Sequence, residues 1–186
     1  IEVFPDRPDL LSHETMARAA RSFLGAHGTV NKVEVVKSGI RIDVDSSLKE
    51  IRPVIMAAVV RGVDTGKNNL EKDAFIQSLM DHQEKLHLTL GRKRSLSSIG
   101  VHDLTRLEAP FRYETVESSF SFTPLSSESK MSISEVLSEH PKGIEYAHLM
   151  DSMDRFPVIL DSNGEILSFP PIINREHTTV REGTTD

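Results

Sequence analysis

The chain has no cysteine and no tryptophan among its 186 residues, and aromatic residues make up only 5%. The lack of cysteine excludes a disulfide scaffold, a thiolate zinc site, an iron–sulfur cluster and a cysteine nucleophile. No apolar run approaches the roughly 18–20 residues of a membrane span, and the N-terminus lacks the basic and apolar regions of a signal peptide. We therefore expect a soluble protein with a mainly aliphatic core and no membrane partner.

The charged residues are abundant but unbalanced. Lys and Arg total 22 against 28 Asp and Glu, which gives a formal net charge of −6. This balance argues against indiscriminate nucleic-acid binding, which needs many phosphate contacts, although a local basic surface is compatible with it. The length suits one domain with a small appendage. Because the chain starts at Ile1 and stops at Asp186 without a terminating element, we expect a piece of a longer protein.

Hydrophobic periodicity predicts two helices in the first half of the chain. One begins after Ser12, a plausible N-cap, and ends at Gly25 or Gly28; the other covers residues 68–90, with Gly91 as its stop. Two β-branched runs predict a hairpin over residues 33–44. The uninterrupted apolar run at 54–60 predicts a strand buried on both faces.

The second half is richer in short β-type segments. Val158–Leu160 and Glu165–Ser168 flank Asn163-Gly164, which predicts a hairpin. Further strands are expected at residues 99–101, 111–116 and 120–122, and short helices at 132–137 and 144–150. Since strands and helices are mixed without a regular βαβ rhythm, the sequence predicts an α+β fold of mixed layers.

A cluster of cations follows the second predicted helix. Gln83–His87 closes the helix, and Arg92, Lys93 and Arg94 follow Gly91 directly. Cations near a helix C-terminus complement its dipole, so this is either a solvated helix end or a contact for phosphate or an RNA backbone. Spacing alone does not decide between these interpretations. His82 and His87 are five residues apart and do not share a helix face, so they do not form a zinc motif.

The segment Leu167–Asn174 is the most unusual in the sequence. Pro170 and Pro171 are adjacent and remove two N–H donors, so this segment is not an ordinary central strand. It is either a sheet edge or the wall of a pocket to which Ser168 and Asn174 offer polar groups. The sequence lacks the Gly-x-Ser-x-Gly nucleophile elbow of hydrolases, a glycine-rich phosphate-binding loop and a dinucleotide-binding motif.

Six segments, in this order, resemble the β subunit of archaeal and eukaryotic phenylalanyl-tRNA synthetase. They span nearly the whole chain, and the last is the most distinctive. The segments are Pro5–Ser12, Ile51–Pro53, Gln83–His87, Gly91–Arg94, Ile99–Leu104 and Phe169–Asn174. The resemblance implies that residues 1–50 end an N-terminal region with a linking helix and hairpin, and that residues 51–186 are a tRNA-editing domain truncated at its C-terminal side.

The same resemblance implies a function. The family attaches phenylalanine to tRNA(Phe) using ATP and Mg²⁺, and its editing domain hydrolyses tyrosine wrongly attached to that tRNA. The expected partners are tRNA(Phe) and the α subunit, in a heterotetramer of two α and two β chains in the cytoplasm. This fragment should carry editing and not aminoacylation, and it needs no cofactor of its own. The alternatives are a noncatalytic RNA-binding module and a subunit-interface domain.

The proposed editing slot is assigned to individual residues by inference. Residues 168–174 are expected to line the slot, with Ser168 and Asn174 as polar contacts, Ile172 as an apolar wall and Pro170 among the substrate-binding residues. His87 and Arg92 are expected at its mouth or against the tRNA end. Arg92, Lys93 and Arg94 are expected to contact the tRNA. The sequence names no general base and no residue that positions the water.

Overall fold

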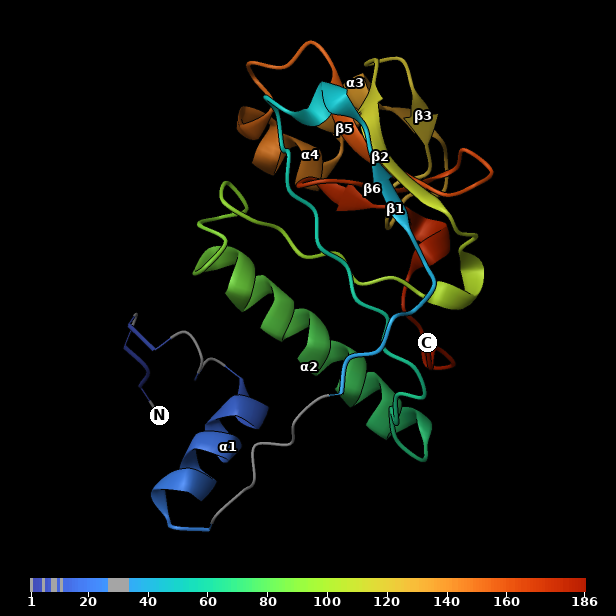
Figure 1. Ribbon diagram of the computed structural model, residues 1–186. Helices are drawn as coiled ribbons and strands as arrows, with labels where there is room; N and C mark the ends of the chain where they lie inside the picture. Colours follow the sequence, from blue (N-terminus) through green and yellow to red (C-terminus); the bar gives the residue numbers. More distant parts are fainter. Residues whose placement is uncertain (1, 5, 8–9, 11, 27–33) are drawn as a thin grey trace. The chain divides into compact units, whose positions relative to one another are not determined.

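The computed structural model describes residues 2–4, 6–7, 10, 12–26 and 34–186 (Figure 1). It divides into two compact units, the first formed by Ile1–Lys37 and Thr65–Ile99, the second by Ser38–Asp64 and Gly100–Asp186. The predicted boundary after residue 50 separates an N-terminal region from an editing domain. It is a functional boundary, and it stays a prediction. Of the segment Pro5–Ser12, residues 5, 8, 9 and 11 lie outside the described part of the chain.

Both helices of the first unit confirm the predicted ones. Helix α1 covers His13–Phe23, with the Ser12 side chain accepting the N–H of Thr15 at 3.3 Å. Helix α2 covers Asn69–Leu88, and the Asn68 side chain accepts the N–H of Glu71 at 3.0 Å. Each N-cap satisfies a backbone donor that has no partner within its helix. Gly25 ends α1 with φ +70°, while Gly28 lies outside the described residues.

The second unit contains a five-stranded sheet in the order β1-β2-β5-β6-β7 (Figure 1). Its strands are Ile42–Val44, Phe111–Val116, Phe156–Leu160, Ile166–Phe169 and Ile173–Asn174. The β1 and β2 strands are parallel, and the other neighbours are antiparallel. A second ladder pairs β3, Ser121–Phe122, with β4, Met131–Ser132. Two helices follow this ladder, α3 at Ile133–Glu139 and α4 at Pro141–Tyr146, and the mixture confirms the predicted α+β fold. Short 3₁₀ turns, η2 to η5, lie at Ser46–Leu48, Leu104–Arg106, Ala147–Leu149 and Glu176–Thr178.

The core of this unit is aliphatic with a few aromatic rings, as the composition implies. Val158 and Phe169 are 0% exposed, and Ile166 and Ile172 are 1% exposed. The rings of Phe156 and Phe169 meet edge to face with centroids 6.1 Å apart, an arrangement that aromatic quadrupoles favour. The buried residues next to Ser168 and Asn174 in the sequence therefore anchor strands β6 and β7 in the core.

The β5–β6 hairpin confirms the prediction made from Asn163-Gly164. Gly164 has φ +79°, which suits the turn. One carboxylate oxygen of Asp161 accepts the N–H groups of Asn163 and Glu165, both at 2.9 Å. The side chain of Asp161 therefore closes the turn and fixes the register from which β6 starts.

Three strand predictions were wrong. Ile42–Val44 pairs with β2 and not with residues 34–37, so there is no hairpin there; Val33 lies outside the described residues. The run Val54–Val60 has no regular structure, and Met56 is 91% exposed. Residues 99–101 are also irregular. An apolar run predicts burial but does not specify a partner strand, and the sheet takes its partners from the second half of the chain instead.

Candidate functional site

Ser168 and Asn174 face each other across the last two strands of the sheet. They are register partners in the β6–β7 ladder, and Pro170 and Pro171 form the turn between those strands. The N–H of Ile172 donates to the carbonyl of Phe169 at 2.8 Å and closes this turn. Strand β7 is the last strand of the described sheet, and on its far side the N–H of Leu125 donates to the carbonyl of Asn174 at 2.9 Å. The segment therefore lies at the end of the sheet, and its role as a pocket wall stays a prediction.

The polar groups of this pair are mutually oriented. The Ser168 hydroxyl, in a residue that is 5% exposed, donates to Oδ1 of Asn174 at 3.0 Å. The Asn174 Nδ2 group donates to the carbonyl of Val101 at 3.4 Å. Segment 100–102 thus lies beside the edge strand. A methyl group at Gly100 would be 3.0 Å from Nε2 of His102 and 3.2 Å from Oδ1 of Asn174, so the missing side chain leaves room for both.

His102 is the third polar group at this edge. Its Nδ1 lies 2.9 Å from the hydroxyl of Thr178, whose own proton is donated to the carbonyl of Arg175 at 3.1 Å. Burial lowers the pKa of His102 from 6.5 to about 4, so the imidazole is neutral at neutral pH. Ser168, Asn174 and His102, which we call the edge cluster, therefore combine a hydroxyl, an amide and a neutral imidazole.

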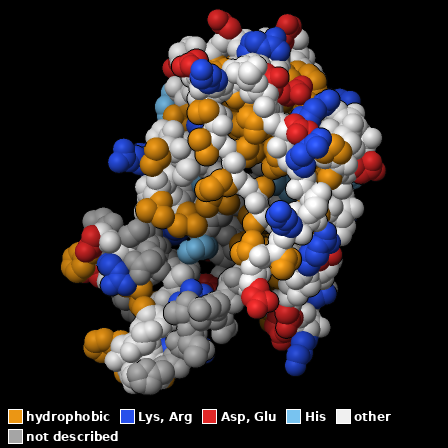
Figure 2. All heavy atoms as spheres, viewed as in Figure 1, with side chains coloured by type: hydrophobic (Ala, Val, Ile, Leu, Met, Phe, Trp, Pro, Cys, Tyr) orange, Lys and Arg blue, Asp and Glu red, His pale blue; other side chains and the backbone are white. Residues whose placement is uncertain are grey.

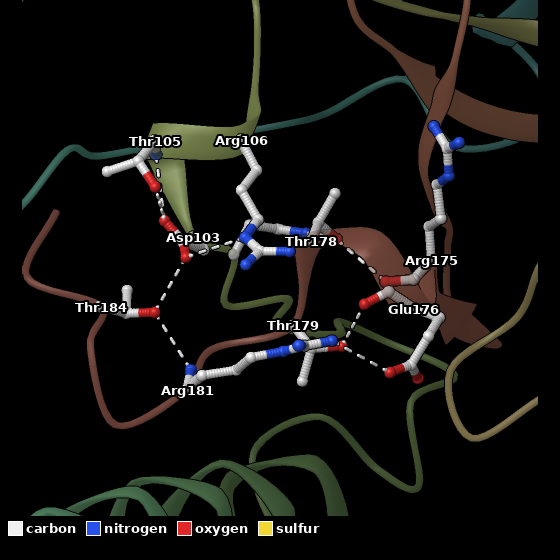
Figure 3. A network of polar contacts seen from close by, with 10 residues as sticks. Asp103, Thr105, Arg106, Arg175, Glu176, Thr178, Thr179, Arg181 and Thr184 are labelled. Carbon is white, nitrogen blue, oxygen red and sulfur yellow. Dashed lines mark hydrogen bonds and ion pairs between the residues drawn. The ribbon is translucent and has the colours of Figure 1, made fainter.

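A network of polar contacts joins the segment around Asp103 to the C-terminal segment (Figure 3). Asp103, 5% exposed, accepts the hydroxyls of Thr105 and Thr184 at 2.6 and 2.9 Å. Burial alone would raise the pKa of Asp103, but these hydrogen bonds outweigh it and hold the pKa below its usual range. The N–H of Asp103 also donates to the carbonyl of Thr178 at 3.0 Å. The residues on either side of the His102–Thr178 contact are thus fixed.

Pro170 and Ile172, the two predicted walls, occupy different positions. Pro170 is partly exposed in the turn, whereas Ile172 is 1% exposed and belongs to the hydrophobic core. Ile172 therefore anchors the turn between β6 and β7 in the hydrophobic core. The binding roles of both residues stay predictions.

His87 belongs to the first unit, where its surroundings explain its burial. Its Nε2 accepts the N–H of Ile99 at 2.8 Å, and its Nδ1 lies 3.3 Å from the carboxylate of Glu84. Burial, followed by the charge of Arg94, lowers the pKa of His87, while Glu84 opposes the change. His87 holds the end of the loop after α2, and its expected place near an editing slot stays a prediction.

The three cations after Gly91 differ in their exposure. Arg92, Lys93 and Arg94 all have positive φ, at 48°, 53° and 66°. Arg94 is 7% exposed and donates to the carboxylate of Glu84 at 2.6 Å, whereas Arg92 and Lys93 are exposed. Over the face drawn in Figure 2, Lys and Arg side chains are interspersed with Asp and Glu side chains. The left-handed turn therefore presents two cations outward and uses the third to fasten itself to α2.

His102 and Thr178 are functional candidates that sequence reasoning missed. His102 lies in Ile99–Leu104, one of the six segments that resemble the family. Thr178 follows Asn174 by four residues. Spacing gave no reason to pair them, because the contact joins residues 76 positions apart. The available signal was a histidine two residues after Gly100, in a segment shared with the family.

The described residues also bear on metal ligation and on membrane crossing. No group of three or more His, Asp or Glu side chains in this part of the chain is arranged to hold a metal ion. None of its helices combines the length and the apolar character needed to cross a membrane.

We expect His102 to make the stability of the chain depend on pH. Its pKa is about 4 when folded and 6.5 ordinarily, so the unfolded chain binds more protons between these values. The contribution of His102 is complete above pH 6.5 and is lost as the pH falls toward 4, for a total of about 3 kcal/mol. His102→Asn keeps a donor for Thr178 and does not titrate. In urea unfolding, the stability advantage of wild type over this variant should shrink by that amount between pH 7 and pH 4; a constant difference would contradict the assignment.

The chain was compared with protein-family models, curated proteins and solved structures. No family model matches it. It is 47% identical over 186 residues to the phenylalanine-tRNA ligase β subunit of Methanococcoides burtonii and 48% identical to that of Methanosarcina barkeri, covering 100% of this chain and 33% of each relative. The structure of an N-terminal fragment of the phenylalanyl-tRNA synthetase β subunit from Pyrococcus horikoshii matches 97% of this chain and 51% of that chain, with a TM-score of 0.86 and 37% identity. The chain spans about a third of the length of these curated relatives.

Proposed function

The chain belongs to the phenylalanine-tRNA ligase β-subunit family, and from that premise we propose that its second unit edits misacylated tRNA by hydrolysing tyrosine from tRNA(Phe). The observation that carries this proposal is the edge cluster, in which Ser168, Asn174 and His102 meet beside the Pro170-Pro171 turn. The remainder of the editing machinery is expected in other parts of the subunit.

The chemistry of discrimination explains why such a site needs polar groups. A pocket shaped for phenylalanine cannot strongly reject a side chain that adds only a hydroxyl, whereas a second site that hydrogen-bonds the hydroxyl can refuse the analogue lacking it. Hydrolysis further requires a held water and donors for the developing oxyanion. The Ser168 hydroxyl donates to Oδ1 of Asn174 and orients the amide, whose Nδ2 group has one N–H beyond the one given to Val101.

The activity of the whole enzyme is also a proposal. The complete protein would attach phenylalanine to tRNA(Phe) with ATP and Mg²⁺, together with an α subunit in a cytoplasmic assembly of two α and two β chains. The proposed hydrolysis at the edge cluster uses neither ATP nor Mg²⁺. This fragment would contribute ester hydrolysis and not aminoacylation.

Contacts with the tRNA are proposed for the turn after α2. Arg92 and Lys93 are exposed and carry the charge needed to meet phosphates. Arg94 would act through its ion pair with Glu84, 2.6 Å long, which fastens the turn that presents the other two. The three predicted contacts would thus divide into two direct ones and one that positions them.

Alanine at Ser168 or at Asn174 tests the editing proposal. In the complete two-subunit enzyme, either change should slow deacylation of tyrosyl-tRNA(Phe) by about 10-fold or more, because each removes a hydrogen bond that orients the edge cluster. The measurement is release of labelled tyrosine from purified tyrosyl-tRNA(Phe). Ser152→Ala, an exposed serine of the same unit, serves as the matched control. Wild-type rates in both variants, with tRNA affinity retained, would instead favour a noncatalytic RNA-binding or subunit-interface module.

A further inference from the structure

We infer that His102 holds the hydrolytic water of the edge cluster through its Nε2 atom. This inference rests on the proposed editing function and names the group that the sequence did not provide. Three observations support it, namely the tautomer of the ring, the position of Nε2 beside Asn174, and the support of the ring by Thr178.

The tautomer follows from the hydrogen bonds of Thr178. The threonine hydroxyl donates its proton to the carbonyl of Arg175 at 3.1 Å, so toward His102 it can only accept. The proton of the neutral ring is therefore on Nδ1, and Nε2 carries a lone pair. Among the described residues Nε2 has no hydrogen-bond partner, which leaves that lone pair available to a water molecule.

The position of Nε2 places this acceptor at the edge cluster. A β-carbon at Gly100 would lie 3.0 Å from Nε2 of His102, 3.2 Å from Oδ1 of Asn174 and 3.6 Å from Nδ2 of Asn174. The Asn174 amide is itself held by Ser168 and Val101. Nε2 can accept a proton of a water molecule, and the second N–H of the Asn174 Nδ2 group, beyond the one given to Val101, can donate to an ester carbonyl.

The water donates one hydrogen bond to Nε2 while its oxygen forms a bond to the ester carbonyl carbon. As the bond between that carbon and the ribose oxygen breaks, the ribose oxygen leaves with the proton that came from the water. Tyrosine and tRNA with a free hydroxyl are the products. Because a base with a pKa of about 4 is weak, His102 orients and polarises the water more than it stores the proton.

The test uses single-turnover deacylation of tyrosyl-tRNA(Phe) by the complete two-subunit enzyme. His102→Asn retains a donor for Thr178 but has no acceptor at the Nε2 position, so we expect the maximal rate to fall about 100-fold with half-saturation by tRNA unchanged. His102→Gln returns a polar atom to that position and should recover at least part of the loss. Thr178→Val removes the support of the tautomer and should also lower the maximal rate.

The outcomes separate this inference from the proposed function. If wild type deacylates and Ser168→Ala is impaired while His102→Asn keeps its maximal rate, the inference is wrong and the editing proposal stands. An effect of His102→Asn on half-saturation alone would equally overturn it. Should His102→Asn fail to fold, Thr178→Val decides: an unchanged maximal rate contradicts the assigned tautomer. His148→Asn, an exposed histidine of the same unit, is the matched control and should behave as wild type. Absence of deacylation in wild type would reject the proposed function itself.

Discussion

Replacing Gly143 by alanine should destabilise the chain by at least about 3 kcal/mol, because the added methyl group has no space. A β-carbon at this buried position of α4 would lie 1.6 Å from the carbonyl oxygen of Val136 and 2.5 Å from its carbonyl carbon. Both are backbone atoms of α3, so no side-chain rotation relieves the clash. The two helices would have to separate. The measurement is the free energy of unfolding in urea.

The matched control is another glycine-to-alanine change in the same unit. Gly183 has no atom within 4 Å of the position of an added β-carbon, and its φ is not in the left-handed region. Gly183→Ala should therefore change the free energy of unfolding by less than about 0.5 kcal/mol. Equal effects of the two substitutions would show that α3 and α4 do not pack as closely as described.

Phe169→Ala should cost about 4 kcal/mol, the largest effect expected from a change at the sheet edge. Phe169 is 0% exposed and its ring meets that of Phe156 edge to face. Truncation removes this contact and leaves a cavity under the β6–β7 turn. Deacylation should fall as well, because the β6 and β7 strands that carry Ser168 and Asn174 would lose their anchor. Thermal and urea unfolding measure the first effect.

The control for this change is Phe23→Ala. Phe23 is a phenylalanine on α1 that is 91% exposed, so its truncation should alter stability by less than about 0.5 kcal/mol. A loss of less than 1 kcal/mol in Phe169→Ala would contradict the burial of that ring. The comparison separates the effect of the cavity from that of losing an aromatic side chain in general.

The sequence predicted those elements that carry local signals. Asn68 and Gly91 delimit α2, and Asn163-Gly164 marks the β5–β6 turn. It failed where pairing is distant. Ile42–Val44 finds its partner in β2, some 70 positions along the chain, and no local pattern specifies that choice. The apolar run 54–60 misled for the same reason, since hydrophobicity indicates burial without naming what would cover it.

The candidate site shows the same division. Adjacent prolines made the segment around Ser168 and Asn174 conspicuous, so two members of the edge cluster were predicted. The third, His102, depends on a hydrogen bond to Thr178 and on burial that lowers its pKa. Neither is encoded in spacing. Similarly, Arg94 looked equivalent to Arg92 and Lys93 in the sequence, whereas its contact with Glu84 distinguishes it.

Each compact unit is made from two separate stretches of chain, and this interleaving governs how the molecule can be cut. The backbone passes from one unit to the other near residues 37, 64 and 99. A fragment beginning at residue 51 would lose β1 and the fully buried Leu48, leaving β2 with an unpaired edge. A cut at any one of these three crossing points would therefore divide one of the units and would not release an intact unit by itself.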